Sequence, residues 1–419
     1  MEKIIITGGK SLIGEVEITG AKNAALGILP ATILANSPSK IDKLPDIQDI
    51  RHYISLLSKL GAKITKEDDS YSIDPSNIEY ENIEHIEEEC TKMRASYYMI
   101  GALLSKYKKV KLPLPGGCDI GARPIDQHIK CFEALGAKVE IKKGYINVVA
   151  DKLVGTNIYM DVVSVGATIN ALLASVMAEG TTTIENVAKE PHVVDIANIL
   201  NLMGAKIKGA GTDMIKIQGV KELRGCEYSV VPDQITAGTY MIASAITKGN
   251  VLVKNVIIKH MESITAKLRE MGNEVIEYDD SIRVIGKDNL KPIKITTLAY
   301  PGFPTDLQQP MGVLMTQANG ISTITENIFE SRFKYVNELI KMGANIMVNG
   351  NVAIFNGPTQ LSEAKIIATD LRAGAAMILA GLIAEGQTEI SELKHIDRGY
   401  DNIVQKFKDL GADIERVNE

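Results

Sequence analysis

The sequence predicts an α/β protein of two similar domains that face one another across a cleft, and two recurring patterns support this. In the first pattern, a helix-like segment ends in Leu or Met, then Gly, a small residue and a strand-like run. The glycines lie 68 to 75 residues apart, at Gly61, Gly136, Gly204, Gly272, Gly343 and Gly411. A Gly just past an amphipathic helix is typical of a left-handed cap, because Gly has no Cβ to clash. Six such caps indicate one helix–strand unit of about 70 residues, with three copies in each half of the chain.

The second pattern comes before the capped helices and defines the order of elements within the unit. It reads AEGTTTIENV from Ala178, TKGNVLVKNV from Thr247, ANGISTITENI from Ala318 and AEGQTEISEL from Ala384. Each copy is a helix end with a Gly, followed by an alternating β-branched stretch that predicts a strand. The unit is therefore a helix, a short strand, a second helix with its Gly cap, and two further strands. Residues 35–45 and 105–115 keep the strand but lose the Glu-Gly.

The composition narrows the class of protein. The 419 residues suffice for two or three domains, and 45% hydrophobic residues supply their cores. A net charge of −6 without a Lys/Arg block argues against nucleic acid or an anionic membrane as partner. The N-terminal apolar run is too short for a signal peptide, and the longest apolar run, from Ala373, stops after twelve residues, whereas a membrane span needs about 20. The four cysteines show no CxxC pairing and the six histidines no ligand spacing, so we expect a cytoplasmic protein without a protein-bound metal.

The segment KLPLPGGCDIGARPIDQH, from Lys111 to His128, concentrates reactive groups in a flexible loop. Two prolines end a strand, and three glycines then free the backbone around Cys118. Most free cysteines are small buried hydrophobes, and we interpret Cys90, Cys131 and Cys226 in this way. For Cys118 the loop favours a reactive thiol, because Arg123 can lower its pKa or hold an anionic substrate beside it.

Basic residues recur at the starts of apolar helices. Lys22 and Asn23 lie where a strand turns into an apolar helix, and a Lys there opposes the helix macrodipole, so a bound anion would explain it; a Lys that extends along the surface to solvent is the alternative. Arg94 and Arg372 occupy the same place in their helices, Arg398 is expected at the start of the last helix, and Arg332 follows Glu330. Together they predict a doubly anionic ligand, since Arg binds carboxylate and phosphate in a bidentate way. Each one alone could be a surface ion-pair residue.

Asp306 is the candidate base. It lies in AYPGFPTDLQQPMG, where two prolines and a glycine fix a turn, and either Thr305 or Asp306 would cap the following helix. A capping role and a catalytic role are equally compatible with the local sequence. The acidic run at 87–89 is interpreted as a solvated first helical turn.

These motifs together resemble the enolpyruvyl transferase family, and most closely its members that act on UDP-N-acetylglucosamine. The resemblance covers residues 1–419 and rests on GAKNAAL, KMRAS, LPGGCDIGARPID, SVGAT, FPTD, TDLRA and HIDRGY. It implies two inside-out α/β barrel domains, each of three βαβαββ repeats, with the active site in the interdomain cleft. The chain would cross between domains twice, so that one domain is 22–229, carrying the Cys118 loop, and the other is 1–21 plus 230–419.

The resemblance also implies the reaction and its residues. The enolpyruvyl group of phosphoenolpyruvate would pass to the 3-hydroxyl of UDP-N-acetylglucosamine with release of phosphate, in the first committed step of peptidoglycan synthesis. Cys118 would donate the proton, form a covalent thioketal and react with fosfomycin-type epoxides. Asp306 would orient and deprotonate the hydroxyl, and Lys22 and Arg398 would stabilise the dianionic intermediate. No metal or organic cofactor is implied.

The substrate contacts implied by the resemblance form two sets. Phosphoenolpyruvate would contact Lys22, Asn23, Arg123, Arg332, Arg372 and Arg398. The nucleotide sugar would contact Arg94, Arg123, Pro124, Ile125, Asp126, Gln127, Ser164, Val165, Gly166, Asp306 and Ile328. One departure is visible, because Val162 stands where some members carry a Lys that touches the nucleotide.

Two alternatives remain. The sister enzyme that acts on shikimate 3-phosphate shares the implied fold, but it has no comparable GGC loop. DNA sliding clamps are also rings of repeated helix–strand units, but they line their hole with basic helices. Here the segment DIANILNLMG has no basic residue and AALGILPATILA is almost wholly apolar, which argues against a clamp.

Overall fold

The computed structural model describes residues 2–68, 70–114, 120–121 and 123–418. By its contacts the chain divides into two compact units. Unit 1 comprises residues 1–19, 118–122 and 232–419, and unit 2 comprises residues 20–117 and 123–231. Ile120 and Gly121, which the expected domain 22–229 includes, are grouped with unit 1, where the Ser331 N–H donates to the Ile120 carbonyl at 3.2 Å.

Unit 2 alternates helices and short strands in the order that the repeated sequence pattern predicts. Its helices are α1 (Lys22–Ala31), α2 (Gln48–Lys59), α3 (Glu87–Lys92), α4 (Tyr98–Tyr107), α5 (Asp126–Ala134), α6 (Val165–Ser175) and α7 (Pro191–Leu202), with 3-10 turns η1 (Thr32–Leu34), η2 (Tyr80–Ile86) and η3 (Arg94–Tyr97). Its strands are β3 (Ser39–Asp42), β4 (Lys63–Glu67), β5 (Ser70–Asp74), β6 (Lys109–Pro113), β7 (Lys138–Lys142), β8 (Tyr145–Val149), β9 (Asn157–Tyr159), β10 (Thr181–Glu185), β11 (Lys206–Lys208), β12 (Met214–Gln218) and β13 (Glu227–Ser229).

Unit 1 repeats this order. Its helices are α8 (Gln234–Ile246), α9 (Glu262–Glu270), α10 (Gln308–Met315), α11 (Val336–Lys341), α12 (Leu371–Ile383), α13 (Lys394–Asp397) and α14 (Ile403–Asp409), with 3-10 turns η4 (Ile258–Met261) and η5 (Thr305–Leu307). Its strands are β1 (Glu2–Thr7), β2 (Ile13–Glu17), β14 (Asn250–Lys254), β15 (Glu274–Glu277), β16 (Ser281–Ile285), β17 (Lys294–Thr296), β18 (Gly320–Thr325), β19 (Ile346–Asn349), β20 (Val352–Gly357), β21 (Lys365–Ile367), β22 (Gln387–Ser391) and β23 (Asp413–Asn418).

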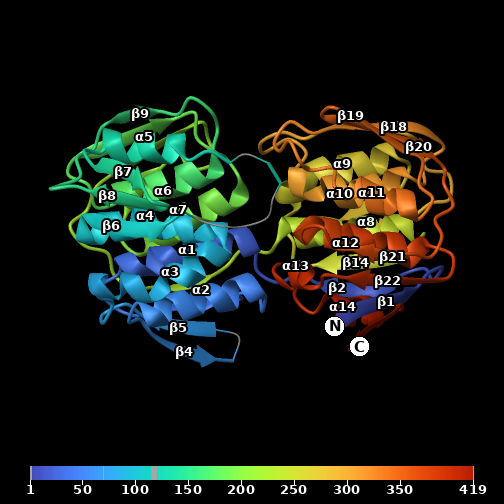
Figure 1. Cartoon of the computed structure of the whole chain (residues 1–419), viewed down its shortest axis with the longest axis horizontal. Helices are drawn as coiled ribbons and strands as arrows, with labels where there is room; N and C mark the ends of the chain where they lie inside the picture. Colours follow the sequence, from blue (N-terminus) through green and yellow to red (C-terminus); the bar gives the residue numbers. More distant parts are fainter. Residues whose placement is uncertain (1, 69, 115–119, 122, 419) are drawn as a thin grey trace. The chain divides into compact units, whose positions relative to one another are not determined.

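Among the described residues, five of the six small sheets share one plan, with four strands and one parallel edge strand, whereas β6-β8-β7 has three antiparallel strands. In unit 2 the orders are β13-β3-β5-β4, β6-β8-β7 and β11-β12-β10-β9. In unit 1 they are β15-β16-β14-β2, β17-β18-β20-β19 and β21-β22-β1-β23. In β10, Ile184 pairs with Ile158 of parallel β9 and Ile215 of antiparallel β12, and Ile324 of β18 repeats this pairing. Strands β1 and β23, from opposite ends of the chain, lie side by side in antiparallel register (Figure 1).

The predicted glycine caps are confirmed. Each of the six glycines follows the last residues of a helix and has a positive φ, between 95° and 112°. In the left-handed region a Cβ would clash, so only Gly enters it without strain. The strands predicted after the second pattern are also present as β10, β14, β18 and β22.

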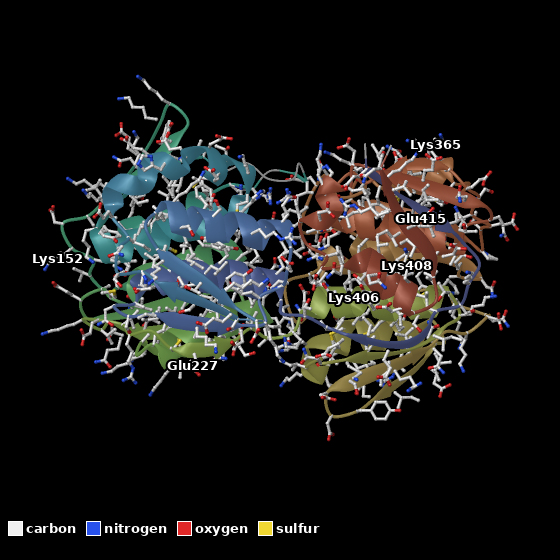
Figure 2. All side chains as sticks on the ribbon, turned by 90° about the horizontal axis from the view of Figure 1, so that it is seen from below. Lys152, Glu227, Lys365, Lys406, Lys408 and Glu415 are labelled. Carbon is white, nitrogen blue, oxygen red and sulfur yellow. The ribbon has the colours of Figure 1, made fainter. Side chains whose placement is uncertain are left out.

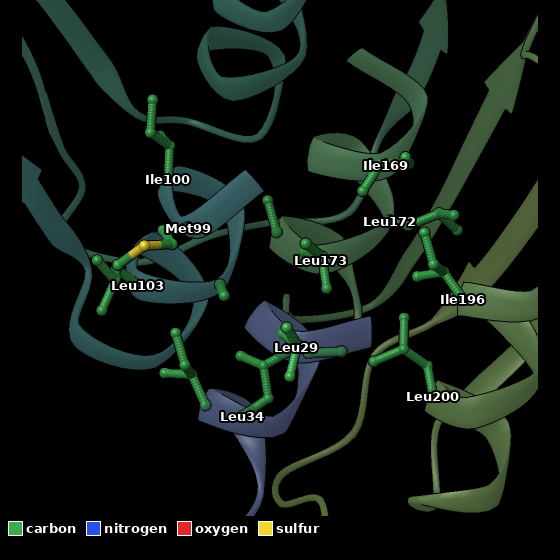
Figure 3. Close-up of a cluster of buried hydrophobic side chains, with 14 of the residues drawn as sticks. Leu29, Leu34, Met99, Ile100, Leu103, Ile169, Leu172, Leu173, Ile196 and Leu200 are labelled. Atoms are coloured by element: carbon green, nitrogen blue, oxygen red, sulfur yellow. The ribbon is translucent and has the colours of Figure 1, made fainter. Parts of the chain in front are cut away.

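Each unit has its own hydrophobic core, built from the apolar helices. Nearly every residue of α1, α6 and α12 is buried. In unit 2, Leu29 of α1 lies between side chains of α4, α6 and α7, including Leu172 and Ile196 (Figure 3). The shorter helices remain amphipathic at the surface, as in α14, where Lys408 is exposed and Phe407 is buried (Figure 2).

Candidate active site

Lys22 stands at the first position of α1, as the sequence predicts, and it is buried. Its Nζ lies 2.8 Å from Oδ2 of Asp49 on α2, and both side chains are less than a tenth exposed. The preceding Ala21 supplies no side-chain cap, so the first amides of α1 have no capping side chain. A buried ammonium needs an ionised partner, and Asp49 provides one. Asn23, the next residue, is half-buried.

Arg94 links the start of η3 to the segment that precedes α5. Its Nη2 donates to the carbonyl of Arg123, and its guanidinium lies 5.8 Å from the ring centroid of Tyr97. Burial lowers the pKa of the Arg94 guanidinium. Arg123 and Ile125 are half-buried and Pro124 is exposed.

Gln127 connects the first turn of α5 to the loop before α6. Its side-chain nitrogen donates to Asp126 at 2.8 Å and to Asp161 at 3.3 Å, while its oxygen accepts from the Asp161 amide at 2.9 Å. Lys130, one turn further along α5, pairs with Asp161 at 2.7 Å. Lys130 is thus a cation next to Val162, where the sequence lacks the family's Lys.

His128 is a buried, neutral imidazole whose tautomer is determined by its neighbours. The Gly101 amide donates to Oδ1 of Asn170 at 2.8 Å, so the Asn170 nitrogen donates to Nδ1 of His128, at 2.9 Å. In a neutral imidazole one nitrogen accepts and the other donates, so Nε2 carries the hydrogen. Burial, reinforced by the charge of Arg94, lowers the pKa of His128 to about 4, although Asp126 opposes the shift.

The segment Ser164 to Gly166 forms the start of α6. Ser164 is the N-cap, and its side chain accepts from the Ala167 amide at 3.3 Å. A Cβ at Gly166 would lie 3.1 Å from Cε1 and Nε2 of His128. The glycine therefore allows the imidazole to lie against the first turn of this helix, next to half-buried Val165.

In unit 1, Asp306 lies between two buried arginines. Its Oδ1 is 2.7 Å from Nη2 of Arg332, and its Oδ2 is 3.3 Å from both Nε and Nη2 of Arg372. Both guanidinium side chains are 3% exposed, whereas the carboxylate is 26% exposed. The expected helix cap at Thr305 or Asp306 is wrong, because neither η5 nor α10 has a side-chain cap. The N-cap positions belong to Pro304 and Leu307, and Asp306 lies inside η5 with its carboxylate paired to the two cations.

Arg372 is fixed from several sides within unit 1. Burial alone would lower its pKa, but Tyr400, Asp306 and Asp233 together raise the pKa of the guanidinium. The guanidinium lies 5.3 Å from the ring centroid of Tyr400, whose hydroxyl is 3.0 Å from that of Thr239. The α12 N-cap is made by Asp370, which accepts from the Arg372 amide at 2.9 Å.

The position predicted for Arg398 is wrong. It follows the last residue of α13, Asp397, and the last helix begins only at Ile403. Asn402 adopts a left-handed conformation with φ of 47°, which separates the two helices. Arg398 is half-buried, and Ile328, the other predicted contact of this unit, is 40% exposed.

The cysteines differ in their surroundings. Cys118 lies outside the described residues. Cys90 and Cys131 are buried, and burial raises the pKa of each thiol to about 12, in agreement with a packing role. Cys226 is only half-buried, and burial raises its pKa as well.

The structure thus has Lys22, Arg94 and Arg372 in the first turns of their helices, and it pairs one carboxylate, Asp306, with Arg332 and Arg372. Such groups can bind phosphate and carboxylate and can stabilise developing negative charge. The sequence analysis did not identify Asp49, His128, Asn170 or Tyr400. Of these only His128 carried a signal, since it ends the Cys118 segment itself.

Comparisons with known proteins agree with the motifs. Residues 6–407 match the family described as EPSP synthase (3-phosphoshikimate 1-carboxyvinyltransferase). The chain is 60% identical over 419 residues to UDP-N-acetylglucosamine 1-carboxyvinyltransferase of Clostridium botulinum, with both chains fully covered. It is 58% identical over 417 residues to UDP-N-acetylglucosamine 1-carboxyvinyltransferase 2 of Clostridium acetobutylicum, with 99% of each covered.

Solved structures share the fold. The enolpyruvyl transferase NikO from Streptomyces tendae superposes with a TM-score of 0.88 at 24% identity, covering 100% of this chain and 99% of that one. EPSP synthase from Acinetobacter baumannii gives 0.73 at 18% identity, with both chains fully covered. By sequence over its whole length and by its mixed α/β fold, the chain therefore belongs to the enolpyruvyl transferase family, on the branch of the UDP-N-acetylglucosamine 1-carboxyvinyltransferases.

Proposed function

We propose that this chain transfers the enolpyruvyl group of phosphoenolpyruvate to the 3-hydroxyl of UDP-N-acetylglucosamine, releasing phosphate, in the first committed step of peptidoglycan synthesis. The observation that carries the proposal is the 60% identity, over the full length of both chains, to a protein named for this activity. The Asp306–Arg332–Arg372 cluster supports it, because it joins a potential base to two anion-binding groups.

The reaction proceeds by addition and elimination. The sugar 3-oxygen forms a bond to C2 of phosphoenolpyruvate and loses its proton, while the methylene carbon C3 takes up a proton. The product is a tetrahedral intermediate that still carries phosphate. Elimination then breaks the bond from C2 to the phosphate oxygen, and C3 returns a proton, which yields the enolpyruvyl ether and inorganic phosphate.

The residues of unit 1 act on the hydroxyl and on negative charge. Asp306 orients the 3-hydroxyl and accepts its proton, and the arginines on either side hold the carboxylate in place. When phosphoenolpyruvate binds, Arg332, Arg372 and Arg398 interact with its phosphate and carboxylate. Ile328 contacts the nucleotide sugar.

The residues of unit 2 bind both substrates. Lys22, Asn23 and Arg123 hold phosphoenolpyruvate, with Asp49 keeping the Lys22 ammonium charged within the protein. The nucleotide sugar lies against residues 123–127 and 164–166 and against Arg94. Cys118 donates the proton to C3 and is the nucleophile for a covalent adduct.

The proposal extends to architecture and location. Each unit would be an inside-out barrel of three βαβαββ repeats, residues 22–229 would form one domain and residues 1–21 plus 230–419 the other, and both would contribute to one active site. We also propose a cytoplasmic location and a reaction without metal or organic cofactor. Within the described residues, no helix is long and apolar enough to cross a membrane.

A phosphate-release assay tests the activity directly. Purified protein is incubated with phosphoenolpyruvate and either UDP-N-acetylglucosamine or shikimate 3-phosphate, and the product is identified by mass. We expect phosphate and an enolpyruvyl ether only with the nucleotide sugar. Release with shikimate 3-phosphate instead would favour the sister activity, and release with neither would overturn the proposal.

A further inference from the structure

Glu326 is a buried carboxylate that joins three separate segments of unit 1. It directly follows β18 and is 3% exposed. Its Oε1 accepts from the Thr297 hydroxyl at 2.8 Å and from the amides of Ile328 at 2.8 Å and Phe329 at 3.1 Å. Its Oε2 accepts from the Thr305 hydroxyl at 2.8 Å. One side chain thus ties the end of β17, the η5 turn and the loop after β18 together.

A charge at this depth is stable only when it is well hydrogen-bonded. The four donors of Glu326 are all neutral hydroxyl or amide groups. Hydrogen bonds to an ionised acceptor are shorter and stronger than those between neutral groups. The carboxylate therefore holds its three segments more firmly than a neutral side chain would.

A neighbour of each partner of the Asp306–Arg332 ion pair donates a hydrogen bond to this carboxylate. Thr305, which donates to Oε2, directly precedes Asp306. Phe329, whose amide donates to Oε1, places its ring centroid 5.3 Å from the Arg332 guanidinium. The geometry of the 2.7 Å ion pair therefore depends on Glu326 from both sides.

We propose that Glu326 is a positioning residue for the transfer reaction, which aligns Asp306 with Arg332 through Thr305 and Phe329. Glu326 is 3% exposed, so it acts through these neighbours rather than on the substrates directly. The expected effect on kcat rests on the proposed function, whereas the expected effect on the Asp306–Arg332 distance does not. A misplacement of about 1 Å in a catalytic group can cost about 10²-fold in rate.

Thr305→Val tests the link to Asp306 with almost no change in volume. It removes the hydroxyl that donates to Oε2, while Thr305→Ser keeps it. We expect kcat of the valine variant to fall about 10- to 100-fold, with KM for phosphoenolpyruvate changed less than about threefold, because alignment matters most in the transition state. The serine variant should retain most of kcat.

Variants of Glu326 itself distinguish position from charge. In Glu326→Gln the amide oxygen can accept at the Oε1 position, and the amide nitrogen can donate to Thr305, whose hydroxyl also accepts. We expect this variant to keep kcat within about fivefold, because it preserves all four contacts. Glu326→Ala should lose at least as much activity as Thr305→Val.

Thr316→Val is the control for lost stability. The Thr316 hydroxyl is 1% exposed and donates to the Val313 carbonyl at 2.7 Å, at the far end of α10. The Thr316→Val variant should have a melting temperature as low as that of Thr305→Val, yet its kcat should be unchanged. Equal losses of kcat in both valine variants, or normal kcat in Thr305→Val, would overturn the proposal.

A crystal structure of Thr305→Val separates this inference from the proposed function. We expect the Asp306–Arg332 distance to lengthen beyond about 3.5 Å, so that the hydrogen bond is lost. If the distance stays at 2.7 Å, Glu326 has no positioning role, even if the wild-type protein is active. If the wild-type protein releases no phosphate but the distance lengthens in the variant, the proposed function fails and the positioning role stands.

Discussion

His128→Gln should make unit 2 more resistant to mild acid. The wild-type imidazole is buried and neutral, and its Nδ1 accepts from Asn170. The Gln side-chain oxygen can accept the same hydrogen bond, but Gln does not titrate. The substitution therefore removes a proton-binding group while it keeps the local hydrogen-bond pattern.

The size of the effect follows from the pKa of His128. It is about 4 in the folded protein, against an unperturbed value of 6.5. Between these values the unfolded chain binds the proton more tightly, so the free energy of unfolding falls as the pH falls through this window. From these two values we calculate a loss of about 2 kcal/mol between pH 7.5 and pH 5 for this one group.

Asp195 acts in the opposite direction and must be separated from His128. Burial raises its pKa to about 6, although hydrogen bonds from Tyr228 and Val231 oppose the shift. Here the folded protein binds the proton more tightly, so its contribution to stability grows as the pH falls from about 6 towards 4. The pH dependence of the wild type alone is therefore ambiguous, whereas the difference between wild type and His128→Gln isolates one imidazole.

Hydrogen exchange of α5 and α6 in urea, at pH 7.5 and pH 5, measures the local unfolding free energy after correction for intrinsic exchange rates. Between pH 7.5 and pH 5, we expect the local unfolding free energy of the wild type to fall by about 2 kcal/mol more than that of His128→Gln. Tyr98→Phe serves as control, because Tyr98 is half-buried and, like His128, lies near Gly166. The substitution removes a hydroxyl without removing the imidazole, and the pH dependence should persist. Equal pH dependence in wild type and His128→Gln would refute a buried neutral His128.

Three further outcomes are expected. Asp306→Asn should leave two buried guanidinium groups without their carboxylate and lower the free energy of unfolding of unit 1 by about 3 kcal/mol. Added phosphate should restore part of this stability, because it binds the two cations. An unchanged melting temperature, both with and without phosphate, would contradict the ion cluster. Gly204→Ala should lower the free energy of unfolding, measured in urea, by about 1–2 kcal/mol. A Cβ at this position would meet no atom within 4 Å, so the loss comes from the positive φ of 112°, and Gly204→Asn should lose less. An epoxide phosphonate of the fosfomycin type should alkylate Cys118, faster with UDP-N-acetylglucosamine; Cys118→Asp should remain active yet escape the label, and intact mass with peptide mapping would reveal a label elsewhere.

Much of the fold could be predicted from the sequence because it is determined locally. A positive φ after a helix needs Gly at that position, so the six caps were visible without any tertiary information. The apolar helices were likewise predictable, since a helix that is hydrophobic all round must be buried. The family followed from contiguous motifs around Lys22, Cys118 and Asp306. The start of the last helix was wrongly placed at Arg398 because residues 398–402, with left-handed Asn402 among them, separate α13 from α14.

Only the tertiary structure decided which side chains meet. The local sequence of Asp306 was compatible with a helix cap. In the structure its carboxylate instead pairs with Arg332 and Arg372, which are 26 and 66 residues away along the chain. The partner of Lys22 lies on another helix, and the tautomer of His128 depends on Asn170, which is 42 residues distant. Sequence pattern determines local backbone conformation and which faces are apolar, because these depend on neighbours along the chain. Pairing between buried polar groups depends on distances across the packed core, and those distances exist only once the helices have packed.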